Sequence, residues 1–535
     1  MTGSELVSSR AMNHAPTNEN EQESRLPLGV FVIAAVYLLM HLLTATRYGY
    51  FRDALYYLAC SEHLDWGYVD QPPLIVALAW LARHTLGTSL RALLFWPALA
   101  GVCRIVLTAA FARELGAGRF GSALAAMLAA TPPVWYVLDH QFAMNALEPL
   151  FWTGCAYMIL RIIKTGNVRL WLAFGAIAGL GLENKYSIAI FAFGLLAGLL
   201  LSAQRKILFT PWLFTGGVVA LIIFLPNLLW NIHHHWPFLE LMHNIRVSGK
   251  DIAFPPLAFL KQQIMMAGPV TFPFWFAGLL FYFFSRNTKP FRVFGWAFVI
   301  TIGFFLVQHG KDYYSAPAYA IVLAAGAVAT ERFLARPLFD AWPRMRAILR
   351  PLAFVWLIAG VLLILPVLLP VLPIEEYVKL QERLHITHSS TERSQIGATL
   401  PSYFTDEFNW EEMAQAVARV YHTLTPEEQA KTAIFTDNYG EAAAIDFFGP
   451  KYGLPKAISG HQSYFLWGPR SYTGEIVIRV GAPLNEGVRS SYESVAIGAT
   501  IENPYAFSNE TRPILLCRGR KENYQTQWAN VKKWE

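Results

Sequence analysis

Long apolar runs separated by short polar segments occupy most of the chain before residue 373. About 20 apolar residues in a row are enough for a helix to cross a bilayer. Eleven runs approach that length, at residues 27–46, 90–112, 119–137, 149–164, 169–184, 186–203, 211–230, 268–285, 293–309, 315–331 and 350–372. The pattern predicts a polytopic α-helical membrane protein with about 11 transmembrane helices. The run at 73–88 is shorter, and both a membrane span and an interfacial helix remain open for it.

The pattern changes after residue 372. A helical period covers Trp410–His422, and strand-like runs follow as TAIFT, EIVIRV, SVAIGATI and PILLC. We therefore predict three parts: a disordered cytoplasmic N-terminus at 1–25, a transmembrane domain at 26–372, and a soluble α/β domain at 373–535. The first apolar run lacks a small-residue cleavage site after it, which favours a retained anchor over a cleaved signal peptide.

Composition agrees with a membrane protein. Of the 535 residues, 54% are hydrophobic and only 15% are charged, whereas soluble domains are about one quarter charged. The net charge of +6 does not indicate nucleic-acid binding, because Lys and Arg are spread between the apolar runs. There are four cysteines, with Cys517 alone in the tail, and no Cys/His zinc motif is present.

Basic residues in alternate loops predict the orientation, because cytoplasmic loops carry an excess of Lys and Arg. With the N-terminus inside, the outer side receives residues 47–89 and everything after 373. We therefore expect a multi-pass protein of the plasma (inner) membrane whose C-terminal domain is periplasmic or otherwise extracytoplasmic. The loops assigned to the cytoplasm contain Arg113 and Arg119; Arg161, Lys164 and Arg169; Arg205 and Lys206; Arg286, Lys289 and Arg292; and Arg332, Arg336, Arg344, Arg346 and Arg350.

The outer loop 47–89 holds the most concentrated polar chemistry, including Asp53, Glu62, Asp65 and Asp70 among several aromatic residues. Asp53 directly follows the first apolar run, where a carboxylate could act as a general base. It could equally be the N-cap of a short helix beginning at Ala54. Asp70, ahead of two prolines, is either a turn residue or a ligand for a metal or a sugar.

Other outer-face residues are candidates for binding a phosphate. Glu148 begins the fourth apolar run, where it is either a helix-start residue or a functional group at membrane depth. The candidate cations are Lys185, Arg246 and Lys311, with Tyr314 beside the last of them. For each cation taken singly, the alternative is a side chain that reaches to the membrane interface. Glu183 is a further candidate partner for Lys185.

These segments together resemble the bacterial dolichyl-phosphate-mannose-protein mannosyltransferase-like family, glycosyltransferase family 39, with its aminoarabinose-transferase relatives and their GT-C fold. The segments that carry the resemblance are FRDALYYLACSEHLDWGYVDQPPL, NALEPLFW, GLENKYS, LPNLLWNIHHHWPFLEL, GKDYYSAPAYA and, in the tail, NYGEAAAIDFFGP and YFLWGP.

The resemblance implies sugar transfer from a polyprenyl monophosphate to an acceptor hydroxyl on the outer face, usually with inversion. Asp53 matches the catalytic acid of the first outer loop, and Glu148 matches a second acidic position. The donor-phosphate contacts would be Lys185, Arg246, Lys311 and Tyr314. Many relatives have Asp-Glu where this chain has Asp53-Ala54.

The resemblance also raises the question of a metal. Asp70 matches an acidic position that, in aminoarabinose-type relatives, holds zinc together with a histidine, for which His243 is the candidate here. Gln71 stands where those relatives have a phosphate-binding Lys, so this chain departs from their pattern next to the zinc and phosphate positions. No cofactor is certain from the sequence, and a divalent metal (Zn, Mg or Mn) is a candidate.

The sequence thus predicts a membrane glycosyltransferase with Asp53 as general base. The expected donor is a polyprenyl-phosphate sugar, with undecaprenyl phosphate as the lipid for a bacterial source. The expected acceptor is a lipid, a glycan or a protein. Membrane lipids are further partners, and nucleic acid is not expected. The alternative is a transporter or flippase of lipid-linked glycans. Against a transporter, the polar residues gather on one face rather than along a path through the bilayer. A non-catalytic scaffold would leave the polar outer loop unexplained.

Overall fold

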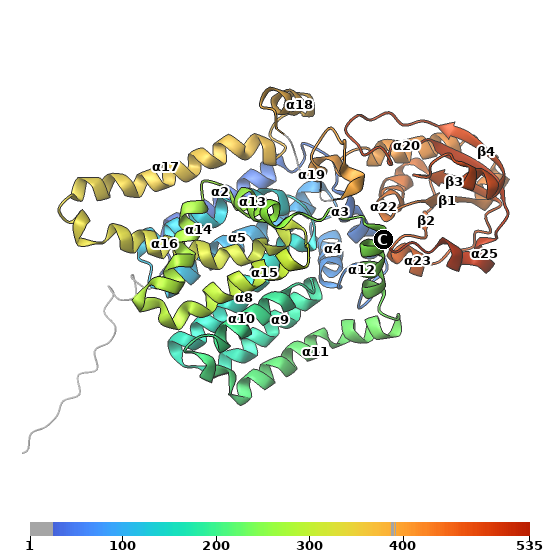
Figure 1. The fold of residues 1–535 in the computed structure, drawn as a ribbon. Helices are drawn as coiled ribbons and strands as arrows, with labels where there is room; N and C mark the ends of the chain where they lie inside the picture. Colours follow the sequence, from blue (N-terminus) through green and yellow to red (C-terminus); the bar gives the residue numbers. More distant parts are fainter. Residues whose placement is uncertain (1–24, 387–389, 391) are drawn as a thin grey trace, which may run out of the picture.

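The computed structural model describes residues 25–386, 390 and 392–535. A bundle of helices comes first, and an α/β unit lies against one end of it (Figure 1). The predicted disordered segment 1–25 lies outside the described residues, apart from Arg25.

Sixteen α-helices make up the described part of the bundle, and each predicted apolar run overlaps at least one of them. They are α2 (Leu28–Thr44), α3 (Arg52–Cys60), α4 (Leu74–Thr85), α5 (Leu90–Glu114), α6 (Arg119–Ala130), α7 (Pro133–Leu138), α8 (Met144–Thr165), α9 (Trp171–Asn184), α10 (Ile188–Leu200), α11 (Pro211–His233), α12 (Pro237–Ser248), α13 (Pro256–Ala267), α14 (Phe272–Phe284), α15 (Arg292–Val307), α16 (Tyr319–Leu334) and α17 (Pro343–Leu368). A 3-10 helix, η4 (Asp312–Ala318), leads into α16.

Not all of these helices are long enough to cross a membrane alone. Within the described residues, six pass by length and composition: α5, α8, α11, α17, α15 with the turn before it, and α16 with η4. The bent pair α13 and α14, which meet at 109°, would make a seventh. The shorter apolar helices include α2, α4, α6 and α10. The chain is therefore a polytopic helical membrane protein, while the number of eleven spans stays a prediction.

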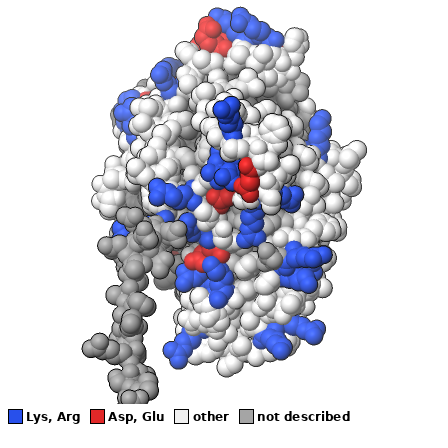
Figure 2. Space-filling model, turned by 90° about the vertical axis from the view of Figure 1, so that its left-hand side faces the viewer, with Lys and Arg blue, Asp and Glu red and all other residues white. Residues whose placement is uncertain are grey.

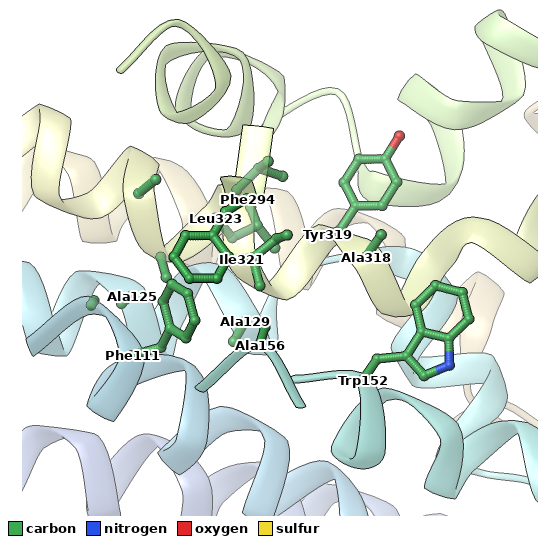
Figure 3. Packing of buried hydrophobic residues seen from close by; sticks show 14 of the residues in the cluster. Phe111, Ala125, Ala129, Trp152, Ala156, Phe294, Ala318, Tyr319, Ile321 and Leu323 are labelled. Atoms are coloured by element: carbon green, nitrogen blue, oxygen red, sulfur yellow. The ribbon is translucent and has the colours of Figure 1, made fainter. Parts of the chain in front are cut away.

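Small residues let the bundle helices approach closely. Phe111 of α5, Trp152 of α8 and Phe294 of α15 belong to one buried apolar cluster that also contains alanines of α6 and α16 (Figure 3). Neither Gly278 of α14 nor Gly326 of α16 has room for a Cβ atom, because the backbone of the other helix occupies that space. Close packing of this kind is how helices associate in lipid, where burial of apolar surface gives little driving force between them.

The α/β unit is built on a five-stranded sheet with strand order β2-β1-β3-β5-β4. β1 pairs in parallel with β2 and β3, whereas β5 pairs antiparallel with β3 and β4. The strands are β1 (Thr432–Thr436), β2 (Ile458–Ser459), β3 (Ile476–Val480), β4 (Tyr492–Ala499) and β5 (Ile514–Arg520). The helices are α18 (Ile374–Arg383), α19 (Ser402–Thr405), α20 (Trp410–Tyr421), α21 (Pro426–Lys431), α22 (Tyr439–Phe448), α23 (Ser463–Leu466), α24 (Glu486–Ser490) and α25 (Tyr524–Gln527).

The predicted helix and strands of the tail match α20, β1, β3, β4 and β5 within a few residues. That this unit is a separate domain outside the cytoplasm stays a prediction. The unit packs closely against the helical bundle, because one apolar cluster contains Leu55 of α3 as well as Val417 of α20 and Ala443 of α22. Helices α3 and α22 lie next to each other at this junction (Figure 1).

Candidate active site

Asp53 lies at the junction between the helical bundle and the α/β unit. Its Oδ1 atom accepts a hydrogen bond of 2.7 Å from the hydroxyl of Tyr439, which comes from α22. The Nε atom of Arg52 is 3.7 Å from the same oxygen. Within the described residues, no hydrogen bond or ion pair engages the Oδ2 atom of Asp53. The side chain is 27% exposed, so Oδ2 is the oxygen that remains for an incoming molecule.

The alternative that Asp53 is an N-cap is wrong. Phe51 occupies the N-cap position of α3, and Asp53 lies in the first turn of the helix. A carboxylate in the first turn is favoured by the helix dipole. The side chain of Asp53 is thus available for contacts across the junction.

A group of cations gathers around Glu392, and it includes Arg52, the neighbour of Asp53. Arg52 forms an ion pair of 3.3 Å with the buried Asp406 of the tail. Lys311, ahead of η4, forms ion pairs of 2.7 Å with Glu392 and 3.4 Å with Asp251. Burial alone would raise the pKa of Glu392, but the nearby cations, with Lys311 first among them, lower it to about 2. This low pKa reports a strongly positive environment.

Sequence reasoning missed Lys250 in this group. Burial lowers the pKa of Lys250, and the neighbouring charges of Glu392, Arg52 and Lys311 also act on it. The segment GKD at 249–251 has no motif that distinguishes it from a surface loop. Its placement depends on a tertiary contact, since the backbone of Asp251 forms a bridge with that of Glu392.

A second group gathers three of the residues predicted to handle the donor. The Nζ atom of Lys185 is 3.2 Å from Glu148 Oε2, and it lies 4.3 Å from the ring centre of Tyr314. Ser187 donates a hydrogen bond to the other carboxylate oxygen of Glu148. Lys185 also donates to Asn145, at 2.6 Å. Glu148 rather than Glu183 is therefore the carboxylate partner of Lys185.

The two groups are connected through one short segment of chain. Lys311 belongs to the group around Glu392, and Tyr314, three residues later, belongs to the group around Glu148. The predicted residues Lys185, Lys311 and Tyr314 are thus brought to one region. Arg246 is not part of either group and lies exposed on α12.

Asp70 lies in the loop before α4 and is held by hydrogen bonds. The hydroxyl of Tyr56 donates to its Oδ1 atom at 3.0 Å. The amide of Gln71, turned to satisfy its neighbours, donates to both carboxylate oxygens, at 2.8 and 3.0 Å. Burial raises the pKa of Asp70 to about 7, and the charge of Asp53 adds to the rise. Asp70 is therefore close enough to Asp53 for the two carboxylates to influence one another.

The residues proposed for a metal do not form a ligand set. His243 is exposed on α12, and the described residues contain no group of three or more His, Cys, Asp or Glu side chains placed to hold a metal ion. Asp70 is engaged by Tyr56 and Gln71, and with its pKa raised to about 7 it is only partly ionised near neutral pH. A neutral carboxyl group is a poor ligand. These side chains do not fit the predicted zinc site, so no chemical step is derived through a metal.

A cavity of about 490 Å³ lies on the other side of α3. Leu58 and Glu62 line it from α3 and the turn after it, Arg83 from α4, and Phe447 and Lys456 from the tail. Asp53 is not among its lining residues. This cavity is adjacent to the Asp53 group without being part of it.

Comparisons with known proteins agree with this geometry. The sequence profile of the dolichyl-phosphate-mannose-protein mannosyltransferase family matches residues 70–230. The lipid A galacturonosyltransferase RgtD of Rhizobium johnstonii is 28% identical over 241 residues, which cover 42% of this chain and 47% of that protein. The chain thus spans about half the length of the curated relative that it matches.

Solved structures match over nearly the whole fold. ArnT from Cupriavidus metallidurans in the apo state superposes with a TM-score of 0.58 at 16% identity, covering 91% of this chain and 97% of that one. The same protein bound to undecaprenyl phosphate gives a TM-score of 0.57 at 14% identity, with the same coverage. The resemblance predicted from the sequence is confirmed, and the fold is of the GT-C type.

Proposed function

We propose that this chain, a relative of the GT-C membrane glycosyltransferases, transfers a sugar from a polyprenyl-phosphate donor to a hydroxyl group of an acceptor. One observation carries the proposal: Asp53 has one carboxylate oxygen anchored and the other open, and its neighbour Arg52 belongs to the group of cations around Glu392. A lipid-linked sugar phosphate needs a base for the incoming hydroxyl and positive charge for the departing phosphate.

The reaction would proceed as a direct displacement. Asp53 Oδ2 accepts the proton of the acceptor hydroxyl as its oxygen attacks the anomeric carbon of the sugar. The bond from that carbon to the phosphate oxygen breaks, and the polyprenyl phosphate leaves with the electron pair. Attack on the face opposite the phosphate inverts the anomeric centre. Lys311 and Lys185 stabilise the negative charge that develops on the phosphate.

Both cations already form ion pairs with carboxylates, and a donor phosphate has to compete with these partners. Glu392 forms an ion pair with Lys311, and Glu148 forms an ion pair with Lys185. A donor phosphate must displace or share these partners. Glu148, buried and held by Ser187, would orient Lys185 rather than react.

The proposed donor is an undecaprenyl-phosphate sugar. ArnT, which has the same fold, was solved with undecaprenyl phosphate, and RgtD is a transferase that acts on lipid A. A lipid acceptor is accordingly the first class to try with this chain, ahead of a glycan or a protein.

The distribution of surface charge supports an outer location for the site. Figure 2 views the end of the bundle that lies away from the tail, and this end bears many Lys and Arg side chains with few Asp and Glu. A membrane protein keeps such positive surfaces on the cytoplasmic side. We therefore place the N-terminus inside and Asp53, with the tail, outside.

The test uses purified full-length protein in lipid nanodiscs. Radiolabelled undecaprenyl-phosphate galacturonic acid, aminoarabinose and mannose are offered with lipid A as the acceptor, and both labelled product and released undecaprenyl phosphate are measured. A glycosyltransferase yields the two products in equal amounts. A flippase moves the donor across liposome membranes without splitting it, which would contradict the proposal.

A further inference from the structure

We infer that Tyr439, a residue of the C-terminal α/β unit, positions the carboxylate of Asp53 for proton transfer. The inference rests on the proposed function and adds to it a residue from the opposite end of the chain. The hydroxyl of Tyr439 donates its 2.7 Å hydrogen bond to Asp53 Oδ1. With Oδ1 fixed, the torsional freedom of the carboxylate falls, and the exposed Oδ2 keeps one orientation for the acceptor hydroxyl.

The surroundings of Tyr439 hold its ring on several sides. Its ring centre is 4.6 Å from that of Tyr56, and the guanidinium carbon of Arg52 lies 5.5 Å away over the ring. Its backbone N–H donates a hydrogen bond of 3.2 Å to His461 Nδ1. The side chain is therefore fixed by packing as well as by its own hydrogen bond, as a positioning residue must be.

Local structure fixes the backbone of Tyr439 as well. It is the first residue of α22 and follows closely after β1, which has parallel neighbours on both sides. A capping box closes the start of the helix: Asn438 Oδ1 accepts from the N–H of Glu441 at 2.9 Å, and the Glu441 carboxylate accepts from the N–H of Asn438 at 3.1 Å. Capping of this type commonly contributes about 1 kcal/mol to helix stability.

The contact across the junction is close because the next residue is glycine. A Cβ atom on Gly440 would lie only 2.5 Å from Cγ of Arg52. Any larger residue would push α22 away from α3 and draw the Tyr439 hydroxyl from Asp53. The α/β unit thus supplies part of the reaction centre in addition to any role in choosing the acceptor.

The experiment compares two single-hydroxyl deletions in the full-length protein. Tyr439→Phe removes the hydroxyl that reaches Asp53. Tyr452→Phe is the matched control, because the Tyr452 hydroxyl donates at 2.6 Å to another carboxylate of the same unit, Glu411, away from Asp53. Turnover is measured with the undecaprenyl-phosphate sugar that the wild type accepts, and thermal unfolding is followed for each protein.

We expect Tyr439→Phe to lower kcat by about 10- to 100-fold, the range for loss of a hydrogen bond to a charged group, with KM for the donor changed less than about twofold. Tyr452→Phe should retain the wild-type kcat. Equal kcat values for the two variants would overturn the inference, as would a Tyr439→Phe effect confined to KM.

A thermal cycle provides a readout that does not need activity. The shifts in melting temperature of Asp53→Ala, Tyr439→Phe and the double variant, each relative to the wild type, should be non-additive, because either single change breaks the same hydrogen bond. Additive shifts would contradict the contact. Failure of the proposed function is distinguishable: the wild type itself would then split no donor, and the inference would fall with it.

Discussion

The chain contains two groups built from the same three residue types, and their contrast explains why only one of them is a candidate for catalysis. In the bundle, Asp139 pairs with Arg104 at 2.7 Å and accepts from the Tyr37 hydroxyl at 2.7 Å. At the junction, Asp53 is paired with Arg52 and Tyr439. The Asp139 side chain is 0% exposed, whereas that of Asp53 is 27% exposed.

Access, rather than residue type, separates the two groups. Arg104 is buried against the ring of Trp135, 4.2 Å from its centre, and Gly101 leaves space that the Asp139 carboxylate fills. The group therefore fixes α2, α5 and the end of α7 together. An ionisable group within membrane helices commonly indicates function, but here burial on all sides leaves a role in folding. Asp53 keeps one oxygen for a substrate.

The largest expected effect comes from disrupting the buried Asp139 group, and it is an effect on folding. Asp139→Asn should leave the charge of Arg104 uncompensated and lower the free energy of unfolding by about 3–5 kcal/mol, as measured by chemical denaturation in detergent. Turnover per folded molecule should stay at the wild-type level.

Replacing both charges sharpens this test. The double variant Arg104→Met/Asp139→Leu removes the buried pair altogether, and it should recover most of the lost stability because apolar groups need no charge partner. A double variant no better than Asp139→Asn would argue that the group does more than hold helices together.

Lys311, a cation at the junction, should affect binding of the donor, whereas Arg104 affects folding. Lys311→Met removes the partner of Glu392 and Asp251 and should raise KM for the undecaprenyl-phosphate donor by about 10- to 100-fold, the range for a charge-assisted contact. Steady-state kinetics over a range of donor concentrations measure it. Lys431→Met, which removes an ion pair of 3.0 Å with Glu475 on the tail surface, is the control and should leave KM unchanged.

The smallest effect concerns the pH dependence of stability. Burial raises the pKa of Asp70 from its usual 3.8 to about 7. The folded protein thus favours the neutral carboxyl, and this contribution to stability is lost as the pH rises from about 4 through 7. Relative to Asp70→Asn, which stays neutral, the wild type should melt at progressively lower temperature between about pH 4 and 7, with no further fall above that range. If the melting temperatures of the two proteins changed with pH by the same amount over that interval, the raised pKa of Asp70 would be contradicted.

The sequence predicted most of the long helices and strands, and it also singled out three residues that the structure brings together. Apolar runs predicted where the bundle helices lie, since a helix in lipid needs a long apolar surface. Alternating residues predicted β1, β3, β4 and β5. Lys185, Lys311 and Tyr314 could be proposed as neighbours because each lies in a very short loop that the sequence predicts on the same side of the membrane.

Other parts of the site depend on contacts between distant segments. Tyr439 reaches Asp53 across 386 residues of sequence, and Lys250 joins the cations only because its strand-like neighbour meets Glu392. The Asp139 group was also missed: its members sit singly in helices α2, α5 and at the end of α7, with no shared spacing. Arg246 was placed in the site by loop position and His243 by the resemblance, yet α12 leaves both exposed.

The most direct measurement is the rate of sugar transfer by Asp53→Asn in nanodiscs, beside the wild type and with the same undecaprenyl-phosphate donor. The account predicts a fall in kcat of about 10²- to 10⁴-fold, the usual contribution of a general base, with an unchanged melting temperature. Undiminished transfer by Asp53→Asn would contradict the account and make Glu148 or Asp70 the next residue to test.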